Sequence, residues 1–303
     1  MKRVSRQLVR HAHALAREIG ARAVMLLGDA IEGDEELSGL VRTVNFCTIL
    51  ITRGREVSSL ATCPYCTVVT VPDIHMTRVG QVKVALLICL AKRILERGDR
   101  VVCLTGIDGS SVIDTLMVLN LGTEPELFLA SSAVTLAGQT NAEVFERILT
   151  LATQLAVEGR EGRPVGTLFV LGDHEQVARQ SRSLVLNPFH GYPVSCRNIL
   201  DSALEETIKE FSALDGAFLI DDDGVVLAAG VQLLPTSQAA ALSSGLGTRH
   251  AAAAAITAST KAVAICISHS TGTVTVFKSG EMIAEIHKAA NGPTPQAAVA
   301  GPT

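Results

Sequence analysis

The strongest constraint on the fold is the regular return of short apolar runs, separated in the first half by longer segments with helical spacing. The runs are residues 23–27, 47–52, 67–71 and 100–105. Apolar residues recur at helical spacing over residues 7–19 and 79–97, and Gly98 ends the second of these segments. Because strands that alternate with helices form parallel sheets, this order predicts a doubly wound, Rossmann-like α/β domain. Ligands of such a domain are expected at the C-terminal edge of its strands.

The second half has a different pattern, because several of its short strand-like runs are joined by turns. The runs are residues 167–171, 217–220, 225–229, 262–268 and 273–278. Asp222-Asp223-Gly224 and Thr271-Gly272 lie between successive runs and are strong hairpin signals. We therefore expect a second α/β domain with a mixed sheet that is at least partly antiparallel.

The chain of 303 residues is long enough for two domains of about 150 residues each. A helical segment at residues 141–158 is followed by a charged, glycine-rich connector, and the boundary is expected near residues 130–145. We predict one domain over residues 1–135 and another over 136–288. Residues 289–303 carry no charge and are rich in small residues and proline, which predicts a disordered tail.

Composition indicates a folded, soluble protein, with 48% hydrophobic and 18% charged residues. The net charge of −4 argues against an extended basic surface for nucleic acid. The longest apolar run, residues 84–91, is much shorter than the roughly 20 residues of a membrane helix and predicts a buried core helix. The basic N-terminus leads into a polar amphipathic segment, so we expect a cytoplasmic protein without a membrane partner.

Cysteine usage favours reduced thiols over a disulfide framework, because the number of cysteines is odd and five of the seven lie in apolar stretches. These five are Cys47, Cys89, Cys103, Cys196 and Cys266. Only Cys63-Pro64-Tyr65-Cys66 has redox spacing and looks like a glutaredoxin motif, but a β-rich run follows it where a helix would be needed. A redox protein is therefore a minor alternative. A zinc site is less favoured still, because no second Cys or His pair has ligand spacing.

A loop at residues 105–111 is rich in small residues and is predicted to connect a strand to an apolar helix that contains Val112, Leu116 and Leu119. Backbone N–H groups at such a junction can bind an anion, which suggests a small regulatory ligand. The alternative is an ordinary strand-to-helix turn, because neither the P-loop nor the dinucleotide fingerprint is complete.

Three segments of the second half carry candidate site residues, and the first is Asp215-Gly216-Ala217 before a predicted strand. The Asp215 carboxylate is suited to a hard cation such as Mg²⁺ or Mn²⁺. Gly216 would allow a base or sugar to approach the backbone closely. The alternative is a simple turn, which is the more common role of an Asp-Gly pair that precedes a strand.

The second segment is Gly247-Thr248-Arg249-His250, which precedes an alanine run that predicts a helix beginning near His250. Helix N–H groups, the Thr248 hydroxyl and the Arg249 guanidinium could meet at one phosphate group. The alternative is that Thr248 is an N-cap and Arg249 a solvated surface charge.

The third segment is Ser268-His269-Ser270, at the end of an apolar strand and the start of a hairpin. A neutral histidine such as His269 can bind a metal, and the neighbouring hydroxyls can bind phosphate oxygens. The alternative is a polar loop without a ligand.

Together these segments resemble the successive motifs of the diadenylate cyclase domain, over residues 167–287. The resemblance also includes residues 168–173, 187–192 and 228–235. The first domain resembles the C-terminal domain of pyruvate kinase in its layout. The whole arrangement is most similar to the archaeal-type cyclases, which have a soluble N-terminal domain.

The resemblance implies an enzyme that joins two ATP into cyclic di-AMP, with Mn²⁺ or Mg²⁺ as cofactor and with two subunits of a homo-oligomer facing each other. The implied metal ligands are Asp215 and His269, and the implied catalytic residues are Asp215, Arg249 and His250. The implied ATP-binding residues are Gly216, Ala217, Leu233, Gly247, Thr248, Arg249, His250 and Ser268.

Two positions depart from the pattern of the family. Ala251 follows Arg249-His250 where the family usually has a second arginine, and His269-Ser270 stand where many members have acidic residues. His269 could replace a carboxylate as a metal ligand. The departures leave an alternative function, namely a catalytically weak or inactive sensor that binds ATP or cyclic di-AMP.

Overall fold

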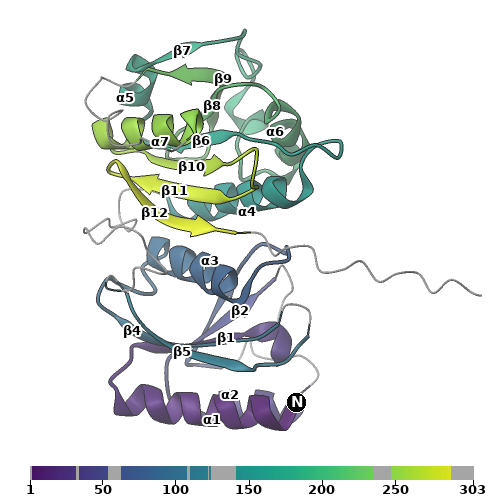
Figure 1. The fold of residues 1–303 in the computed structure, drawn as a ribbon, viewed down its shortest axis with the longest axis vertical. Helices are drawn as coiled ribbons and strands as arrows, with labels where there is room; N and C mark the ends of the chain where they lie inside the picture. The colour runs from purple at the N-terminus through teal and green to yellow at the C-terminus, as the bar shows by residue number, and fades with distance from the viewer. Residues whose placement is uncertain are drawn as a thin grey trace, which may run out of the picture.

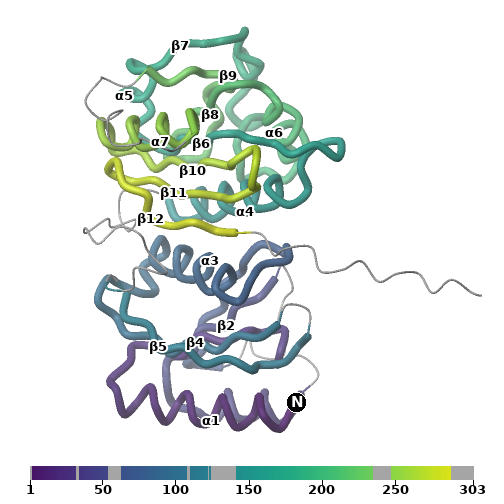
Figure 2. The backbone as a smooth tube through the Cα atoms, viewed as in Figure 1, coloured from purple at the N-terminus to yellow at the C-terminus, as the bar shows by residue number. Residues whose placement is uncertain are grey.

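The computed structural model describes residues 2–31, 34–53, 63–107, 110–121, 123, 141–234 and 247–287. Two sheets with their covering helices lie one above the other along the longest axis of the molecule (Figure 1). The tube view shows the same two units, with helix α3 between them (Figure 2). The predicted α/β class with two sheets is confirmed. The predicted tail and most of the predicted domain boundary lie outside the described residues.

The first sheet has five strands in the order β3-β2-β1-β4-β5. Their bounds are β1 (Ala23–Leu27), β2 (Thr48–Thr52), β3 (Cys66–Thr70), β4 (Arg100–Thr105) and β5 (Thr115–Asn120). Strands β1 to β4 are parallel, as the alternation with helices predicted. Figure 1 shows α1 (Lys2–Glu18) and α2 (Glu35–Thr43) on one face of the sheet and α3 (Arg78–Ala91) on the other. Residues 28–30 form the short helix η1 after β1.

The segment after β4 is a strand, so the predicted helix through Val112, Leu116 and Leu119 is wrong. Strand β5 runs antiparallel to β4 and pairs Thr115 with Thr105 at its start. The β-branched residues of this segment suit a pleated edge strand, and the pairing overrides the helical spacing of its apolar residues. The described part of the loop at residues 105–111 therefore has no helix N-terminus to bind an anion, and Asp108 and Gly109 lie outside the described residues.

Helix α3 ends at Ala91, six residues before the predicted end. Arg93 adopts a left-handed conformation with φ of 56°, and the Ile94 N–H donates back to the Cys89 carbonyl. A left-handed residue directly after a helix is a common way to end it. The turn brings Leu95 back into the core, where it is 1% exposed.

The second sheet has seven strands in the order β12-β11-β10-β6-β8-β9-β7. Their bounds are β6 (Leu168–Leu171), β7 (Ser181–Ser183), β8 (Ala217–Ile220), β9 (Val226–Leu233), β10 (Val263–Ile267), β11 (Val274–Lys278) and β12 (Glu281–Ile286). All neighbours are antiparallel except β6 and β8. The two predicted hairpins are present as β8–β9 and β10–β11. The mixed sheet was therefore predicted correctly, but β7 and β12 were not predicted.

Alternation along the strands separates the two faces of this sheet. Phe169, Phe218 and Ile265 belong to the same core as α4 (Ala142–Glu158). Leu168, Ala217 and Cys266 belong to a second core on the opposite face. Ala253, Ala254 and Ile256 of α7 (Thr248–Ser259) pack into that second core. Short helices α5 (His174–Arg179) and α6 (Glu205–Phe211), with turns η3 (Val194–Cys196) and η4 (Ser202–Leu204), complete the unit.

The apolar run at residues 84–91 forms the buried part of α3, as predicted. Its residues are buried on nearly every side, because α3 packs against the first sheet, against α4 and against β12. The charged end of the run joins the two units through an ion pair of 2.6 Å between Lys92 and Glu146. No helix in the described part of the chain is long and apolar enough to cross a membrane.

Candidate active site at one edge of the second sheet

Two of the three candidate segments lie together because of the directions of the central strands β10, β6 and β8 of the second sheet. The side of the sheet where β6 and β8 begin and β10 ends is called the edge below. Strands β6 and β8 are parallel and begin at the same edge, with Leu168 opposite Ala217. Strand β10 is antiparallel to β6 and ends at that edge, with Cys266 opposite Leu168. Asp215 lies just before β8 and Ser268 just after β10, so topology alone brings them to the same side.

Helix α7 brings Arg249 to this edge, where it forms an ion pair with Asp215. The Arg249 Nη2 and Asp215 Oδ1 atoms are 3.1 Å apart. The side chain of Asp215 is 82% exposed and that of Arg249 is 33% exposed. The structure therefore brings together a carboxylate and a guanidinium that are 34 residues apart in the sequence.

Arg249 passes close to Gly166 and His269, which complete the described part of the site. A methyl group built on Gly166 would lie 3.0 Å from Arg249 Nη1 and 2.8 Å from His269 Cβ. The buried Nε of Arg249 has no hydrogen-bond partner among the described residues. The guanidinium that meets the exposed Asp215 carboxylate through Nη2 is suited to bind another anion at that place.

The turn after β10 is held by its own hydroxyl groups. The Ser268 Oγ lies 3.3 Å from Ser270 Oγ, and the Thr271 N–H donates to Ser268 Oγ at 3.4 Å. The Thr271 hydroxyl donates to Thr273 Oγ1 at 2.9 Å. Ser268 and His269 are therefore held on an ordered turn at the edge where Arg249 and Asp215 lie.

Helix α7 begins at Thr248, two residues before the predicted start, and its N-cap is Gly247. The alternative in which Thr248 is the N-cap is therefore wrong. Thr248 and Gly247 are both exposed. The N–H groups of the first helical turn have no partners within the helix, so this end can bind an anion. Residues 235–246, which lead to it, lie outside the described part of the chain.

His250 is half-buried and packs against the second sheet. Its Nε2 is 3.3 Å from Thr275 Oγ1, its Nδ1 is 3.7 Å from Cys266 Sγ, and its ring meets Phe277 edge to face. Burial lowers the pKa of His250, and burial also raises the pKa of the Cys266 thiol to about 12. Both ring nitrogens thus have protein neighbours, and the contact of His250 with phosphate stays a prediction.

Three further predicted ATP contacts support the sheet in this structure. Gly216 has a φ of 104°, and a methyl group on it would lie 2.6 Å from the backbone nitrogen of Val231 in β9. Ala217 is 1% exposed and Leu233 is 8% exposed, and both belong to the core under α7. Ala217 and Leu233 therefore present little surface to a ligand here, whereas Gly216 is half-buried.

The predicted metal ligands Asp215 and His269 lie on neighbouring parts of the same edge, both beside Arg249. No group of three or more His, Cys, Asp or Glu residues suited to a metal occurs among the described residues. The Asp215 carboxylate fits Mg²⁺ or Mn²⁺, because proteins often hold such ions by one or two carboxylates while substrate phosphates and water complete the coordination shell. The exposed Asp215 carboxylate is open to such a shared ion.

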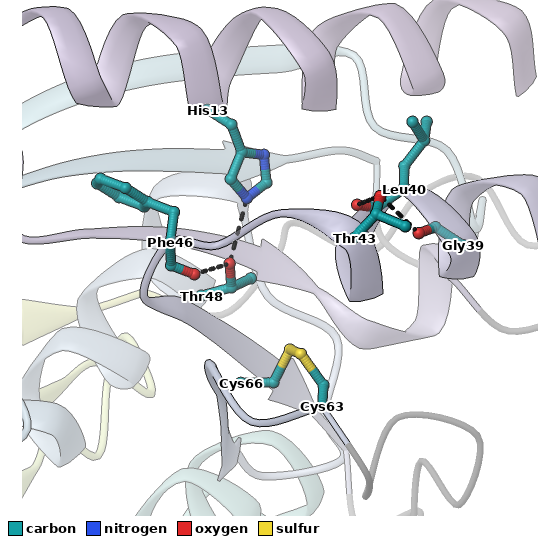
Figure 3. The surroundings of a disulfide bond; sticks show 8 residues. All are labelled: His13, Gly39, Leu40, Thr43, Phe46, Thr48, Cys63 and Cys66. Carbon is teal, nitrogen blue, oxygen red and sulfur yellow. Dashed lines mark hydrogen bonds between the residues drawn. A yellow bond between two sulfur atoms is a disulfide. The ribbon is translucent and has the colours of Figure 1, made fainter.

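The cysteine pair lies in the first unit, far along the chain from this edge. Cys63 and Cys66 form a disulfide, and Cys66 begins β3 (Figure 3). As the sequence indicated, a strand follows in place of the helix that a glutaredoxin-like centre requires. The other cysteines are free, but Cys196 is exposed, so its predicted place in the core is wrong. Figure 3 also shows His13, whose Nε2 lies 3.2 Å from Thr48 Oγ1.

Sequence reasoning missed Gly166. The only signal was a glycine directly before the strand predicted at residues 167–171, and glycine is common at such positions. Its contacts with Arg249 and His269 depend on the pairing of β6 with β10, which one sequence does not reveal.

Comparison with known proteins gives two family matches that together cover most of the chain. Residues 154–282 match the nucleotide-binding domain of the DisA bacterial checkpoint controller. Residues 5–129 match DacZ_P, described as a probable sensor domain.

Two relatives carry the name diadenylate cyclase. The protein of Methanocaldococcus jannaschii is 37% identical over 203 residues, which are 67% of this chain and 64% of the relative. That of Haloferax volcanii is 37% identical over 199 residues, which are 65% of this chain and 71% of the relative. The chain thus spans slightly less than two thirds of the length of the first relative and slightly more than two thirds of the second.

Solved structures give weaker likenesses. A hypothetical membrane spanning protein from Bacillus cereus has a TM-score of 0.36 at 20% identity and covers 47% of this chain and 63% of its own. DacA from Staphylococcus aureus has a TM-score of 0.32 at 20% identity and covers 46% of this chain and 84% of its own. Likenesses with TM-scores this low do not bear on the function of the chain.

Proposed function

This chain belongs to the diadenylate cyclase family, and we propose that it condenses two ATP molecules into cyclic di-AMP with release of two pyrophosphates. The observation that carries the proposal is the ion pair between Asp215 and Arg249. It unites, at one exposed edge, a carboxylate able to share a metal with ATP and a guanidinium able to bind phosphate.

In the proposed reaction, the 3′-hydroxyl oxygen of each ATP forms a bond to the α-phosphorus of the other. The bond from that phosphorus to the oxygen bridging to the β-phosphate breaks, and pyrophosphate leaves with its electron pair. The hydroxyl proton passes to solvent. Two such steps close the ring, so two sites must face each other, and we propose a homo-oligomer in which the edges of two second sheets meet. An exposed Asp215 suits this arrangement, since the partner's ATP must reach the same edge.

The residues of one chain would act mainly by position and charge. Arg249 would exchange the Asp215 carboxylate for phosphate oxygens at its Nη2 atom. Thr248 and the first N–H groups of α7 would bind the same triphosphate, and Ser268 would contact it from the turn after β10. Asp215, with His269 as the second ligand, would hold Mn²⁺ or Mg²⁺. When bound, that ion would supply charge neutralisation on the phosphates and lower the pKa of the attacking hydroxyl.

His250 would act indirectly in this scheme. Its contacts with Thr275 and Cys266 fix the start of α7 on the sheet, and Arg249 is the adjacent residue in the helix. We therefore propose that His250 holds Arg249 in place and does not itself bind phosphate.

The test is incubation of the purified protein with ATP and Mn²⁺ or Mg²⁺, with the product identified by mass. We expect cyclic di-AMP and pyrophosphate in a ratio of about one to two, and loss of both with Asp215→Asn. Glu206→Gln is a matched control, because Glu206 is also an exposed carboxylate that lies 3.1 Å from an arginine, Arg160, but it lies on α6. Unchanged product with Asp215→Asn would refute the role of Asp215.

The alternative is a sensor that binds the nucleotide without turnover. It is favoured by Ala251, which stands in the first turn of α7 where the family usually has arginine, so one phosphate-binding group is absent. Calorimetric binding of ATP or cyclic di-AMP without any product by chromatography would support the sensor. Turnover by the unmodified protein would exclude it.

A further inference from the structure

We infer that Gly166 is a positioning residue of the nucleotide site, and that its missing side chain provides the space in which Arg249 and His269 reach their places. Gly166 lies two residues before β6, at the edge where β8 begins and β10 ends. The inference rests on the proposed function, because the position of Arg249 matters if Arg249 binds phosphate.

The close contacts come from two different segments. A methyl group on Gly166 would lie 2.8 Å from His269 Cβ, 3.0 Å from His269 N and 3.0 Å from Arg249 Nη1. Carbon atoms that are not bonded normally remain about 3.5–4.0 Å apart. Residue 166 therefore touches the candidate metal ligand and the candidate phosphate ligand at the same time.

The need for glycine here is one of space. The φ of Gly166 is not positive, so any L-residue could adopt its backbone conformation. Gly216, in contrast, has a φ of 104°. Alanine at 166 would therefore be tolerated by the backbone and would act through the groups it pushes.

The two neighbours of Gly166 differ in how far they can move. His269 offers Cβ and its backbone nitrogen, both tied to the turn that Ser268 and Thr271 hold together. Arg249 offers the end of a long side chain, which can swing. We therefore expect Gly166→Ala to displace the guanidinium away from Asp215, whose carboxylate it meets at 3.1 Å.

The displacement should weaken ATP binding. A guanidinium moved from its place forfeits charge-assisted hydrogen bonds to phosphate, and the loss of one such bond corresponds to about a tenfold or larger rise in the dissociation constant. The Arg249 Nε atom has no partner among the described residues, so no observed hydrogen bond at that atom would hold the side chain back.

The experiment is a double-mutant cycle between Gly166→Ala and Arg249→Ala on the affinity for 3′-deoxy-ATP, which lacks the attacking hydroxyl and cannot be turned over. The affinity is measured by calorimetry with Mg²⁺ present. Gly166→Ala should raise the dissociation constant about tenfold in the natural sequence, but less than about threefold on the Arg249→Ala background, where only the contacts with His269 remain. Gly39→Ala is the control, since a methyl group there meets nothing within 4 Å, and it should leave this affinity unchanged. Equal effects of Gly166→Ala on both backgrounds would overturn the inference that Gly166 determines the place of Arg249.

The same double-mutant cycle, measured on the free energy of unfolding in urea, separates this inference from the proposed function. If the natural protein binds no ATP, the proposed function fails. Gly166→Ala should still destabilise the natural sequence more than the Arg249→Ala variant, because the contact with Nη1 exists without ligand. Additive unfolding energies would show that Gly166 does not determine the place of Arg249.

Discussion

Alanine in place of Gly216 is expected to destabilise the second unit strongly, whether or not a nucleotide binds there. Gly216 has a φ of 104°, in the region that L-residues rarely adopt. A methyl group there would meet three backbone atoms of β9, namely Val231 N at 2.6 Å, Val231 O at 2.8 Å and Gly230 C at 2.8 Å. None of these atoms can rotate aside, because Val231 pairs with Ala217 in the sheet.

The magnitude follows from two separate costs. Holding a residue in a disfavoured backbone region costs about 1–3 kcal/mol. Forcing a methyl group into a filled space costs about 1–3 kcal/mol more. We therefore expect Gly216→Ala to lower the free energy of unfolding by about 2–6 kcal/mol, near the upper end of single substitutions.

Gly191→Ala separates the two costs within the same unit. Gly191 has a φ of 83°, but a methyl group on it meets nothing within 4 Å, so only the backbone cost of about 1–2 kcal/mol remains. Urea unfolding should be followed by far-UV circular dichroism, because the chain has no tryptophan and only two tyrosines. If Gly216→Ala and Gly191→Ala differed by less than about 0.5 kcal/mol at equal slopes, the close approach of β9 to Gly216 would be refuted.

Three further predictions concern the site and the titrating groups. Asp215→Asn should lower the midpoint of thermal unfolding by no more than about 2–4 °C in calorimetry. The Asp215 side chain is 82% exposed, and an ion pair with so exposed a partner contributes at most about 1 kcal/mol. A larger drop would show that Asp215 has a structural role beyond this surface pair. Burial lowers the pKa of His13 and of His250 below the ordinary 6.5. Below about pH 6.5 the unfolded chain therefore binds protons at these two histidines more readily than the folded chain, and the free energy of unfolding should fall as the pH drops. The urea midpoint of His250→Gln should change less between pH 7.5 and 5.5 than that of the natural protein, and equal changes would count against the burial of a neutral ring. Cys63→Ser should leave ATP turnover, measured by chromatography of the product, unchanged. Strand β3 follows the Cys63–Cys66 disulfide in place of the helix that a reactive thiol pair requires, so we expect no role of this pair in turnover. Loss of turnover would support the redox alternative.

Sequence reasoning found the elements whose residues carry their own signal. The buried strands β1, β2 and β10 are short apolar runs, and the turns at Asp222-Asp223-Gly224 and Thr271-Gly272 have strong hairpin residues. It failed where pairing decides the outcome. Apolar residues between 112 and 119 have helical spacing, and yet residues 115–119 lie in strand β5 because they pair with β4.

Strand β12 shows the same limit from the other side. Its sequence, Glu-Met-Ile-Ala-Glu-Ile, is rich in helix formers and gives little strand signal. The strand exists because Ser279 and Gly280, with φ of 53° and 82°, form a tight turn that returns the chain along β11. Two residues with positive φ are typical of two-residue hairpins. A Ser-Gly pair after a predicted strand was the available signal.

The candidate site was predictable in its components more than in its contacts. The residue types of Asp215 and Arg249 indicated chemistry. Strand direction explains the place of Asp215 before β8, and helix α7 brings Arg249 beside it. The contacts of His250 could not be predicted, because they depend on Cys266 and Thr275, which face each other across β10 and β11.

The pairing of Asp215 with Arg249 also bears on how a charged site remains ready for a ligand. A carboxylate meant for a metal and a guanidinium meant for phosphate would each be unpaired without ligand, and the ion pair satisfies both. Because Asp215 is 82% exposed, separating the pair costs at most about 1 kcal/mol, while charge-assisted bonds to a triphosphate are worth about 1.5–3 kcal/mol each. A buried ion pair would oppose ATP binding more strongly, because breaking it would leave a charge unpaired away from water. The exposed edge therefore allows Arg249 to be oriented before ATP arrives and released from Asp215 when it does.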